Sequence, residues 1–233
     1  MMHPIYFKIA LIIGLFIPLS CAVSKKNISS EKAAYSYLAL GDSYTIGESV
    51  CVDGNYPTQL AASLNKTLKE KTSVKIIAKT GWTTTNLLSA IAHENPTTNY
   101  NLVSLLIGVN NQYQEKPFSI YEKEFPKLVD MAINFAGGNP KNVIILSIPD
   151  YGFTPFGQES GKAEKTTAEL KRYNNFANKI ASEKGVQFKN ITPITQNGLA
   201  NPELVASDGL HPSEIAYKKF VEIIFKSALK IIR

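Results

Sequence analysis

Short apolar runs alternate with amphipathic helical patterns from residue 36 to near the end of the chain, and this alternation limits the possible fold most strongly. Continuous apolar runs that end at turn residues are typical of strands buried on both faces of a parallel sheet. The five runs are residues 36–40, 74–78, 102–107, 143–148 and, with a weaker apolar pattern, 186–191. Leucines at a spacing of four behind Pro57, and similar apolar repeats over 170–180 and 221–229, predict helices. The alternation therefore predicts an α/β sandwich, with helices on both faces of one parallel sheet of about five strands.

The first 20 residues have the features of an export signal. One basic residue, Lys8, precedes an apolar run over 9–19, which is too short to cross about 30 Å of hydrocarbon as a mature helix. The small residue before Cys21 resembles a bacterial lipoprotein cleavage site, although Pro18 stands where such signals usually carry Leu. We therefore expect a signal peptide and a lipid anchor on Cys21. Simple secretion is the second choice, and a retained N-terminal anchor is the third.

Residues 21–35 are mostly small and polar, and we interpret them as a tether to a single domain over 36–233. The chain has only two cysteines, which excludes a disulfide-rich scaffold and a site with four cysteine ligands. If Cys21 is not lipidated, a disulfide with Cys51 is the competing interpretation, since exported proteins enter oxidising compartments. If Cys21 is lipidated, we expect Cys51 to be an inert thiol.

Polar residues follow the predicted strands, at the edge where open α/β sheets bind their ligands. Ser43 comes just after the first strand, Gly81 after the second and Asn110 after the third. The chain has three histidines, and two of them lie in the export signal and in a helical pattern. Only His211 lies in a turn, three residues after Asp208. We expect these residues to meet at one edge of the sheet.

This set of residue types suits acyl transfer. A serine nucleophile needs a base within hydrogen-bond reach, and the base needs a third group that orients it. We predict Ser43 as the nucleophile, His211 as the base and Asp208 as the orienting group. Suitable donors for an oxyanion are the N–H groups of Ser43 and Gly81 together with the Asn110 amide. Helix capping and turn formation alone would explain Ser43 and Asp208, but they would not explain His211.

Four blocks in this order resemble the SGNH hydrolases, a branch of the GDSL esterases and lipases, over about residues 36–230. The blocks are Gly41-Asp42-Ser43-Tyr44, the Gly81 turn, Gly108-Val109-Asn110-Asn111 and Asp208-Gly209-Leu210-His211-Pro212. The resemblance implies a flavodoxin-like three-layer α/β/α fold with sheet order 2-1-3-4-5. It also implies ester hydrolysis without metal or cofactor by the residues named above. Asn111 replaces the usual Asp of the third block, which serves a structural turn in many relatives.

Three features leave alternatives open. Tyr44 suits either the core or the wall of an acyl pocket. Trp82 suits packing or a pocket wall rather than a cofactor contact. The longest segment without periodicity, Asp150–Ala163, is predicted to be a loop at the end of the fourth strand, where long loops are often functional.

Several function classes are disfavoured by the sequence. The formal charge is +6, but the lysines are spread along the chain, so we expect no nucleic-acid partner. The phosphate-binding loop, the dinucleotide fingerprint and the H-E-x-x-H zinc motif are absent from the sequence. The G-x-S-x-G elbow of α/β-hydrolases also fails, because Thr45 stands at its second glycine.

We therefore expect an exported, monomeric serine esterase of the cell envelope. Its predicted substrates are short acyl esters or acetylated glycans, and lysophospholipids are less favoured. The alternative is a non-catalytic envelope lipoprotein that binds glycan on the same scaffold. A matched nucleophile, base and acid argue against that alternative, since a binding protein needs none of them.

Overall fold

The computed structural model describes residues 33–233. The predicted signal peptide (1–20) and Cys21 lie outside this part of the chain, as does most of the predicted tether over 21–35. The first strand begins at Tyr35, one residue before the predicted start of the domain. None of the helices in residues 33–233 combines the length and the apolar character needed to span a membrane.

Five parallel strands form one sheet in the order β2-β1-β3-β4-β5, which confirms the predicted order. The strands are β1 (Tyr35–Gly41), β2 (Thr72–Ala78), β3 (Leu102–Leu106), β4 (Val143–Leu146) and β5 (Gln187–Lys189). Every residue of β3 and β4 is buried, as expected for central strands that are covered on both faces. The edge strands β2 and β5 are more exposed, which explains the weaker apolar pattern of the fifth run.

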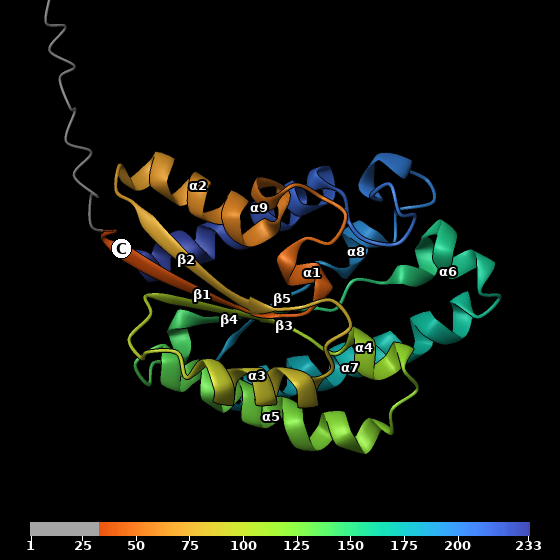
Figure 1. Cartoon of the computed structure of the whole chain (residues 1–233), viewed down its shortest axis with the longest axis horizontal. Helices are drawn as coiled ribbons and strands as arrows, with labels where there is room; N and C mark the ends of the chain where they lie inside the picture. The colour runs from red at the N-terminus through yellow and green to blue at the C-terminus, as the bar shows by residue number, and fades with distance from the viewer. Residues whose placement is uncertain (1–32) are drawn as a thin grey trace, which may run out of the picture. The chain divides into compact units, whose positions relative to one another are not determined.

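Two layers of helices enclose the sheet, so the predicted three-layer α/β/α fold is confirmed (Figure 1). One face is covered by α2 (Tyr56–Leu68) and α9 (Glu214–Ile232). The other is covered by α3 (Thr84–Glu94), α5 (Phe118–Phe135) and α7 (Ala163–Glu183). The short helices α1 (Ser43–Ile46), α4 (Val109–Tyr113), α6 (Pro155–Glu159) and α8 (Thr192–Thr195) follow the carboxyl ends of strands. The 3₁₀ turns are η1 (Val52–Gly54), η2 (Pro140–Asn142), η3 (Tyr151–Phe153) and η4 (Pro202–Leu204).

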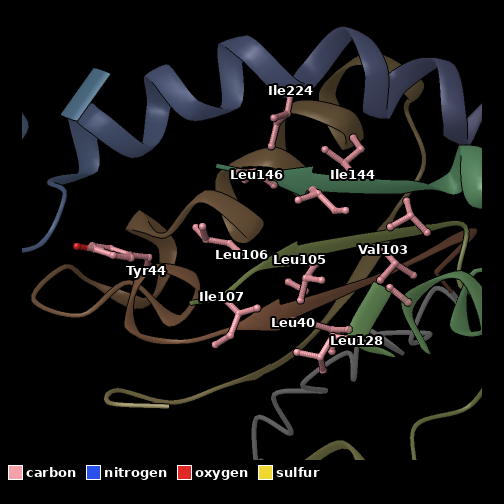
Figure 2. Close-up of a cluster of buried hydrophobic side chains, with 14 of the residues drawn as sticks. Leu40, Tyr44, Val103, Leu105, Leu106, Ile107, Leu128, Ile144, Leu146 and Ile224 are labelled. Carbon is pink, nitrogen blue, oxygen red and sulfur yellow. The ribbon is translucent and has the colours of Figure 1, made fainter. Parts of the chain in front are cut away.

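The core fills the space between the sheet and both helix layers. Successive side chains of a strand point to opposite faces. Figure 2 shows Leu105 on the face that carries Leu128 of α5, and Leu106 on the face that carries Ile224 of α9. All four side chains are buried, and burying each of them contributes about 1.5–3 kcal/mol to folding. This packing holds the strand ends rigidly, and with them the polar residues that follow.

The prediction of a long loop over Asp150–Ala163 is wrong, because this segment folds into η3 and α6 before α7 begins at Ala163. The cause is local capping by polar side chains. The Gly152 N–H donates to Asp150 Oδ1 at 3.0 Å, and the Gly157 N–H donates to Thr154 Oγ1 at 3.1 Å. Helices of three to five residues are too short to show a helical period, which explains why the sequence pattern missed them.

Candidate active site

The first side of the candidate site is the turn over residues 41–44, where β1 passes directly into α1. We call it the nucleophile turn after the predicted role of Ser43. Asp42 caps the helix, since its Oδ1 accepts a hydrogen bond from the Tyr44 N–H at 3.1 Å. Ser43 is the first helical residue, so its own N–H has no acceptor within the helix. Gly41 must be glycine, because a Cβ there would lie 2.0 Å from Thr45 Oγ1.

The second side is the turn over residues 208–211, which lies far away in the sequence and which we call the catalytic turn after the predicted role of His211. His211 Nε2 lies 3.0 Å from Ser43 Oγ, and His211 Nδ1 lies 2.6 Å from Asp208 Oδ2. The other carboxylate oxygen of Asp208 accepts from the N–H groups of Leu210 and His211 at 2.9 and 3.0 Å. The structure thus brings the three residues predicted from the sequence into one hydrogen-bonded chain.

The pKa values of the aspartates in the two turns are shifted in opposite directions. Partial burial disfavours ionisation of Asp208, but hydrogen bonds from the His211 ring, Ser49 and two N–H groups outweigh it and hold the Asp208 pKa well below its ordinary value. Asp208 is therefore ionised at neutral pH. Burial raises the pKa of Asp42 to about 7, and its Oδ2 has no hydrogen-bond partner among residues 33–233. The buried carboxyl of Asp42 is therefore partly protonated near neutral pH.

Ser49 contacts Asp208, and the sequence did not predict this contact. Its Oγ donates to Asp208 Oδ2 at 2.7 Å, the same oxygen that His211 contacts. Ser49 has a φ of 65°, a left-handed conformation that is uncommon for residues other than glycine. The two residues are 159 positions apart, and no motif marks Ser49 in the sequence. Only the meeting of the two turns reveals this contact.

Gly81 and Asn110 also lie together, at the same edge of the sheet. Asn110 Nδ2 donates to the Trp82 carbonyl at 3.1 Å, which places the Asn110 amide beside the Gly81 turn. Gly81 has a φ of +82°, which favours glycine, and a Cβ there would meet no atom within 4 Å. Its backbone is therefore open to approach. The helices α1 and α4, which carry Ser43 and Asn110, follow the adjacent strands β1 and β3 (Figure 1).

Asn111 stands where the resemblance leads us to expect Asp, and its role in this structure is structural. Its side chain is completely buried. Asn111 Oδ1 accepts from the Thr84 N–H at 2.9 Å, and Asn111 Nδ2 donates to Thr84 Oγ1 at 2.8 Å. The residue therefore connects α4 to the start of α3.

Tyr44 belongs both to the core and to the wall of the site. Its side chain is only 2% exposed, and its ring meets the His211 ring edge-on with centroids 5.6 Å apart. Figure 2 places Tyr44 at the end of the cluster of buried side chains. The Tyr44 ring therefore packs against the His211 imidazole.

Trp82 is half-buried and packs against the core.

Cys51 is exposed and lies apart from the hydrogen-bonded chain. Its thiol donates to Glu214 Oε1 at 2.9 Å, and this bond raises the pKa of the Cys51 thiol. The alternative disulfide partner, Cys21, lies outside the described residues. Within residues 33–233, no group of three or more His, Cys, Asp or Glu side chains is arranged to hold a metal ion.

The chain matches the model of the GDSL-like lipase/acylhydrolase family over residues 39–219. No curated protein matches the chain.

Three solved structures share the fold. An acetylxylan esterase from Geobacillus stearothermophilus is 18% identical, with a TM-score of 0.61 over 86% of this chain and 94% of that one. A lipase from a goat rumen metagenome is 18% identical, with a TM-score of 0.66 over 84% and 98%. An extracellular lipase from Streptomyces rimosus is 19% identical, with a TM-score of 0.63 over 83% and 100%. Because the family match covers most of the sequence, the chain belongs to the GDSL-like lipase/acylhydrolase family of SGNH type and is an ester-hydrolysing serine hydrolase.

Proposed function

We propose that Ser43, His211 and Asp208 are the catalytic triad of this carboxylic ester hydrolase. The proposal depends chiefly on the unbroken path from Asp208 Oδ2 to His211 Nδ1 (2.6 Å) and from His211 Nε2 to Ser43 Oγ (3.0 Å). An ionised Asp208 accepts the Nδ1–H, and this leaves Nε2 as the acceptor for the serine proton. The geometry therefore suits base catalysis without any movement of the three side chains.

The reaction proceeds in two halves. Ser43 Oγ attacks the ester carbonyl carbon while His211 Nε2 takes the hydroxyl proton. The tetrahedral intermediate then collapses, the alcohol leaves with the proton from His211, and an acyl group remains on Ser43. Water attacks this acyl group while His211 takes one of its protons. The carboxylic acid leaves, and His211 returns the proton to Ser43.

We assign the oxyanion to three donors, namely the N–H groups of Ser43 and Gly81 and the Asn110 amide. The Ser43 N–H is not used within its helix, and the Gly81 backbone faces open space. The Asn110 amide has two hydrogens, and the Trp82 carbonyl accepts one of them, which leaves the other for a substrate. Such preorganised donors stabilise the negative charge of the tetrahedral intermediate.

Short acyl esters and acetylated glycans are the proposed substrates. The small cavity beside His211 is not lined by Ser43, Gly81 or Asn110, and at about 10 Å³ it has room for about one water molecule, so it offers no channel for a long acyl chain behind the imidazole. A neighbour in fold is an acetylxylan esterase, which supports an acetyl group as the acyl part. Lysophospholipids are less favoured because their acyl chains need a longer apolar channel.

Hydrolysis of p-nitrophenyl esters, from acetate to octanoate, tests this function. We expect the wild-type protein to prefer the shortest esters and to keep its activity in EDTA. Ser43→Ala should lose about 10⁴–10⁶-fold in kcat. Ser182→Ala, on the exposed surface of α7, is the matched control and should keep the wild-type rate. Equal rates in the wild-type protein and Ser43→Ala would contradict the proposal.

We also propose that the protein is exported and anchored to the cell envelope through a lipid on Cys21, with secretion as the second choice. Metabolic labelling with an alkyne fatty acid should mark the wild-type protein and not Cys21→Ser. Export of an unlabelled wild-type protein would favour secretion.

A further inference from the structure

A cleft of about 220 Å³ opens between α4, α6 and the start of α7. We call it the α4–α6 cleft. It is lined by aromatic rings on one side and by paired charged side chains on the other. The function proposed above uses none of these side chains.

The α4–α6 cleft lies next to the proposed active site. Tyr113 lies three residues after Asn110 on α4, a spacing that puts both on one face of the helix. Tyr151 lines this cleft and also the small cavity beside His211. The Phe156 N–H donates to the Gly209 carbonyl at 3.1 Å, which joins α6 to the catalytic turn. A ligand in the cleft would therefore adjoin an ester bound at Ser43.

Three aromatic rings form a fixed wall in the cleft. The Tyr113 ring centroid lies 6.1 Å from that of Tyr151 and 6.1 Å from that of Phe156. Tyr113 is 55% exposed, so part of its ring faces solvent. The Tyr151 hydroxyl is held by Gln112 Oε1 at 2.8 Å. The exposed Tyr113 ring, backed by Tyr151 and Phe156, therefore offers an apolar surface with a polar edge.

The opposite rim is polar and carries no net charge. Lys162 Nζ lies 3.5 Å from Glu115 Oε1, and Lys165 Nζ lies 3.7 Å from Glu169 Oε1. Gln112 Nε2 donates to the other oxygen of Glu169 at 2.8 Å. The rim therefore offers both donors and acceptors. A phosphate or a uronic acid would need an excess of cations, and an alkyl chain would leave these polar groups unpaired.

We propose that the α4–α6 cleft binds a neutral sugar ring of an O-acetylated glycan whose acetyl ester lies at Ser43. The C–H face of a pyranose packs on an aromatic ring, while its hydroxyls need donors and acceptors around the edge. The volume of about 220 Å³ is below the range of about 300–1,000 Å³ that encloses a drug-sized ligand, so it suits one sugar ring. This inference rests on the proposed esterase function and defines its substrate class.

Two substrates separate the sugar site from the catalytic site. One is partially O-acetylated xylotriose, a neutral glycan, and the other is p-nitrophenyl acetate, which has no sugar. In Tyr113→Ala, kcat/KM for the glycan should fall about tenfold relative to kcat/KM for p-nitrophenyl acetate, mainly through KM. Tyr113→Phe keeps the ring and should stay within about twofold of the wild-type ratio. Ile223→Ala, an exposed position on α9, should leave both rates unchanged.

An unchanged ratio in Tyr113→Ala overturns the sugar site and leaves the esterase function intact. The same conclusion follows if the wild-type protein hydrolyses p-nitrophenyl acetate and not the glycan. A loss in Tyr113→Ala that grows with acyl length across p-nitrophenyl esters would assign the cleft to the acyl chain and would also overturn the proposal.

A wild-type protein that hydrolyses neither substrate overturns the esterase function instead. Saturation-transfer NMR with unacetylated xylotriose then tests the cleft alone. Transfer to the sugar in the wild-type protein and its loss in Tyr113→Ala support the site, whereas no transfer in the wild-type protein overturns it.

Discussion

The nucleophile turn (residues 41–44) is enclosed by the core, whereas the catalytic turn (208–211) lies at the surface, and each contains an aspartate. Asp42 is fully buried, and burial raises its pKa to about 7. The Asp208 side chain is 29% exposed, and its hydrogen bonds hold its pKa well below the ordinary value. The core therefore positions Ser43, the proposed nucleophile, and hydrogen bonds position His211, its proposed base. Apart from Ser43 itself, substitutions should consequently affect stability more in the first turn and catalysis more in the second.

After the loss of the proposed nucleophile Ser43 itself, the largest effect is expected for Asp208→Asn, in the catalytic turn. An amide oxygen can still accept from the Leu210 and His211 N–H groups, but the charge that faces His211 Nδ1 is lost. We expect kcat to fall about 10⁴-fold, with little change in melting temperature. Steady-state kinetics and thermal unfolding measure both quantities. A kcat within tenfold of the wild-type value would show that Asp208 does not orient His211.

The neighbours Asn110 and Asn111 on α4 should also differ, the first in its effect on catalysis and the second in its effect on stability. Asn110→Ala should lower kcat by about 10²–10³-fold, because one oxyanion donor is removed. Asn111→Ala should instead destabilise the fold by about 1–3 kcal/mol, because it leaves the buried Thr84 N–H without its acceptor. Kinetics and urea unfolding of both variants separate the two roles. A wild-type rate in Asn110→Ala would remove that residue from the oxyanion site.

Asp42→Asn tests the electrostatics of the nucleophile turn. The folded protein holds the Asp42 proton up to a pH of about 7, whereas the unfolded chain releases it near 3.8. The Asp42 contribution to stability is therefore present below about pH 4 and is lost as the pH rises to about 7. Each unit of pKa difference corresponds to about 1.4 kcal/mol, so the free energy of unfolding falls by a few kcal/mol over this pH range.

Asn at position 42 does not titrate and remains a suitable N-cap. The free energy of unfolding of Asp42→Asn, relative to the wild-type protein, should therefore rise between pH 4 and pH 7. Asp208 has the opposite sign, because its low pKa adds stability that is lost only as the pH falls below about 4. Parallel pH profiles of stability for the wild-type protein and Asp42→Asn would contradict the assignment.

Each turn also contains a glycine, and the two glycines should differ in what they tolerate. A Cβ on Gly41 would lie 2.4 Å from the Leu106 carbonyl as well as 2.0 Å from Thr45, so Gly41→Ala should cost about 3 kcal/mol. At Gly209 the nearest atom would lie 3.6 Å away, and only the φ of +71° is unfavourable, so Gly209→Ala should cost about 1 kcal/mol. Urea unfolding of the two variants measures the difference. Equal losses would contradict the separate roles of the two turns.

The smallest effect is expected for Ser49→Ala, which removes one hydrogen bond to Asp208. We expect kcat to fall about threefold to tenfold, since one such bond contributes about 1 kcal/mol. The acid limb of the pH–rate profile should move to higher pH, because the Asp208 carboxylate then attracts the proton on His211 Nδ1 more strongly. Ser49→Gly should show the same kinetic change with a more stable fold, since a φ of 65° suits glycine. An unchanged pH–rate profile in both variants would limit Ser49 to a structural role.

The sheet was predictable because its central strands are buried on both faces, and β3 and β4 show this as continuous apolar runs. The candidate site was predictable because ligands bind at the carboxyl ends of parallel strands, where Ser43 and Asn110 stand. The short helix α6 was not predictable from its pattern. Its existence depends on caps such as Thr154, and five residues cannot display a period.

The sequence alone determined where the strands lie along the chain and which residue types stand at their ends, since both follow from local patterns of apolar and polar residues. The tertiary structure decided which distant groups meet. Ser49 reaches Asp208 across 159 residues, and the aromatic wall of the α4–α6 cleft joins Tyr113 to Phe156. Such contacts leave no periodic signal, because the residues that form them share no strand or helix. They arise only when packing of the core brings the strand ends, and the turns that follow them, to one edge of the sheet.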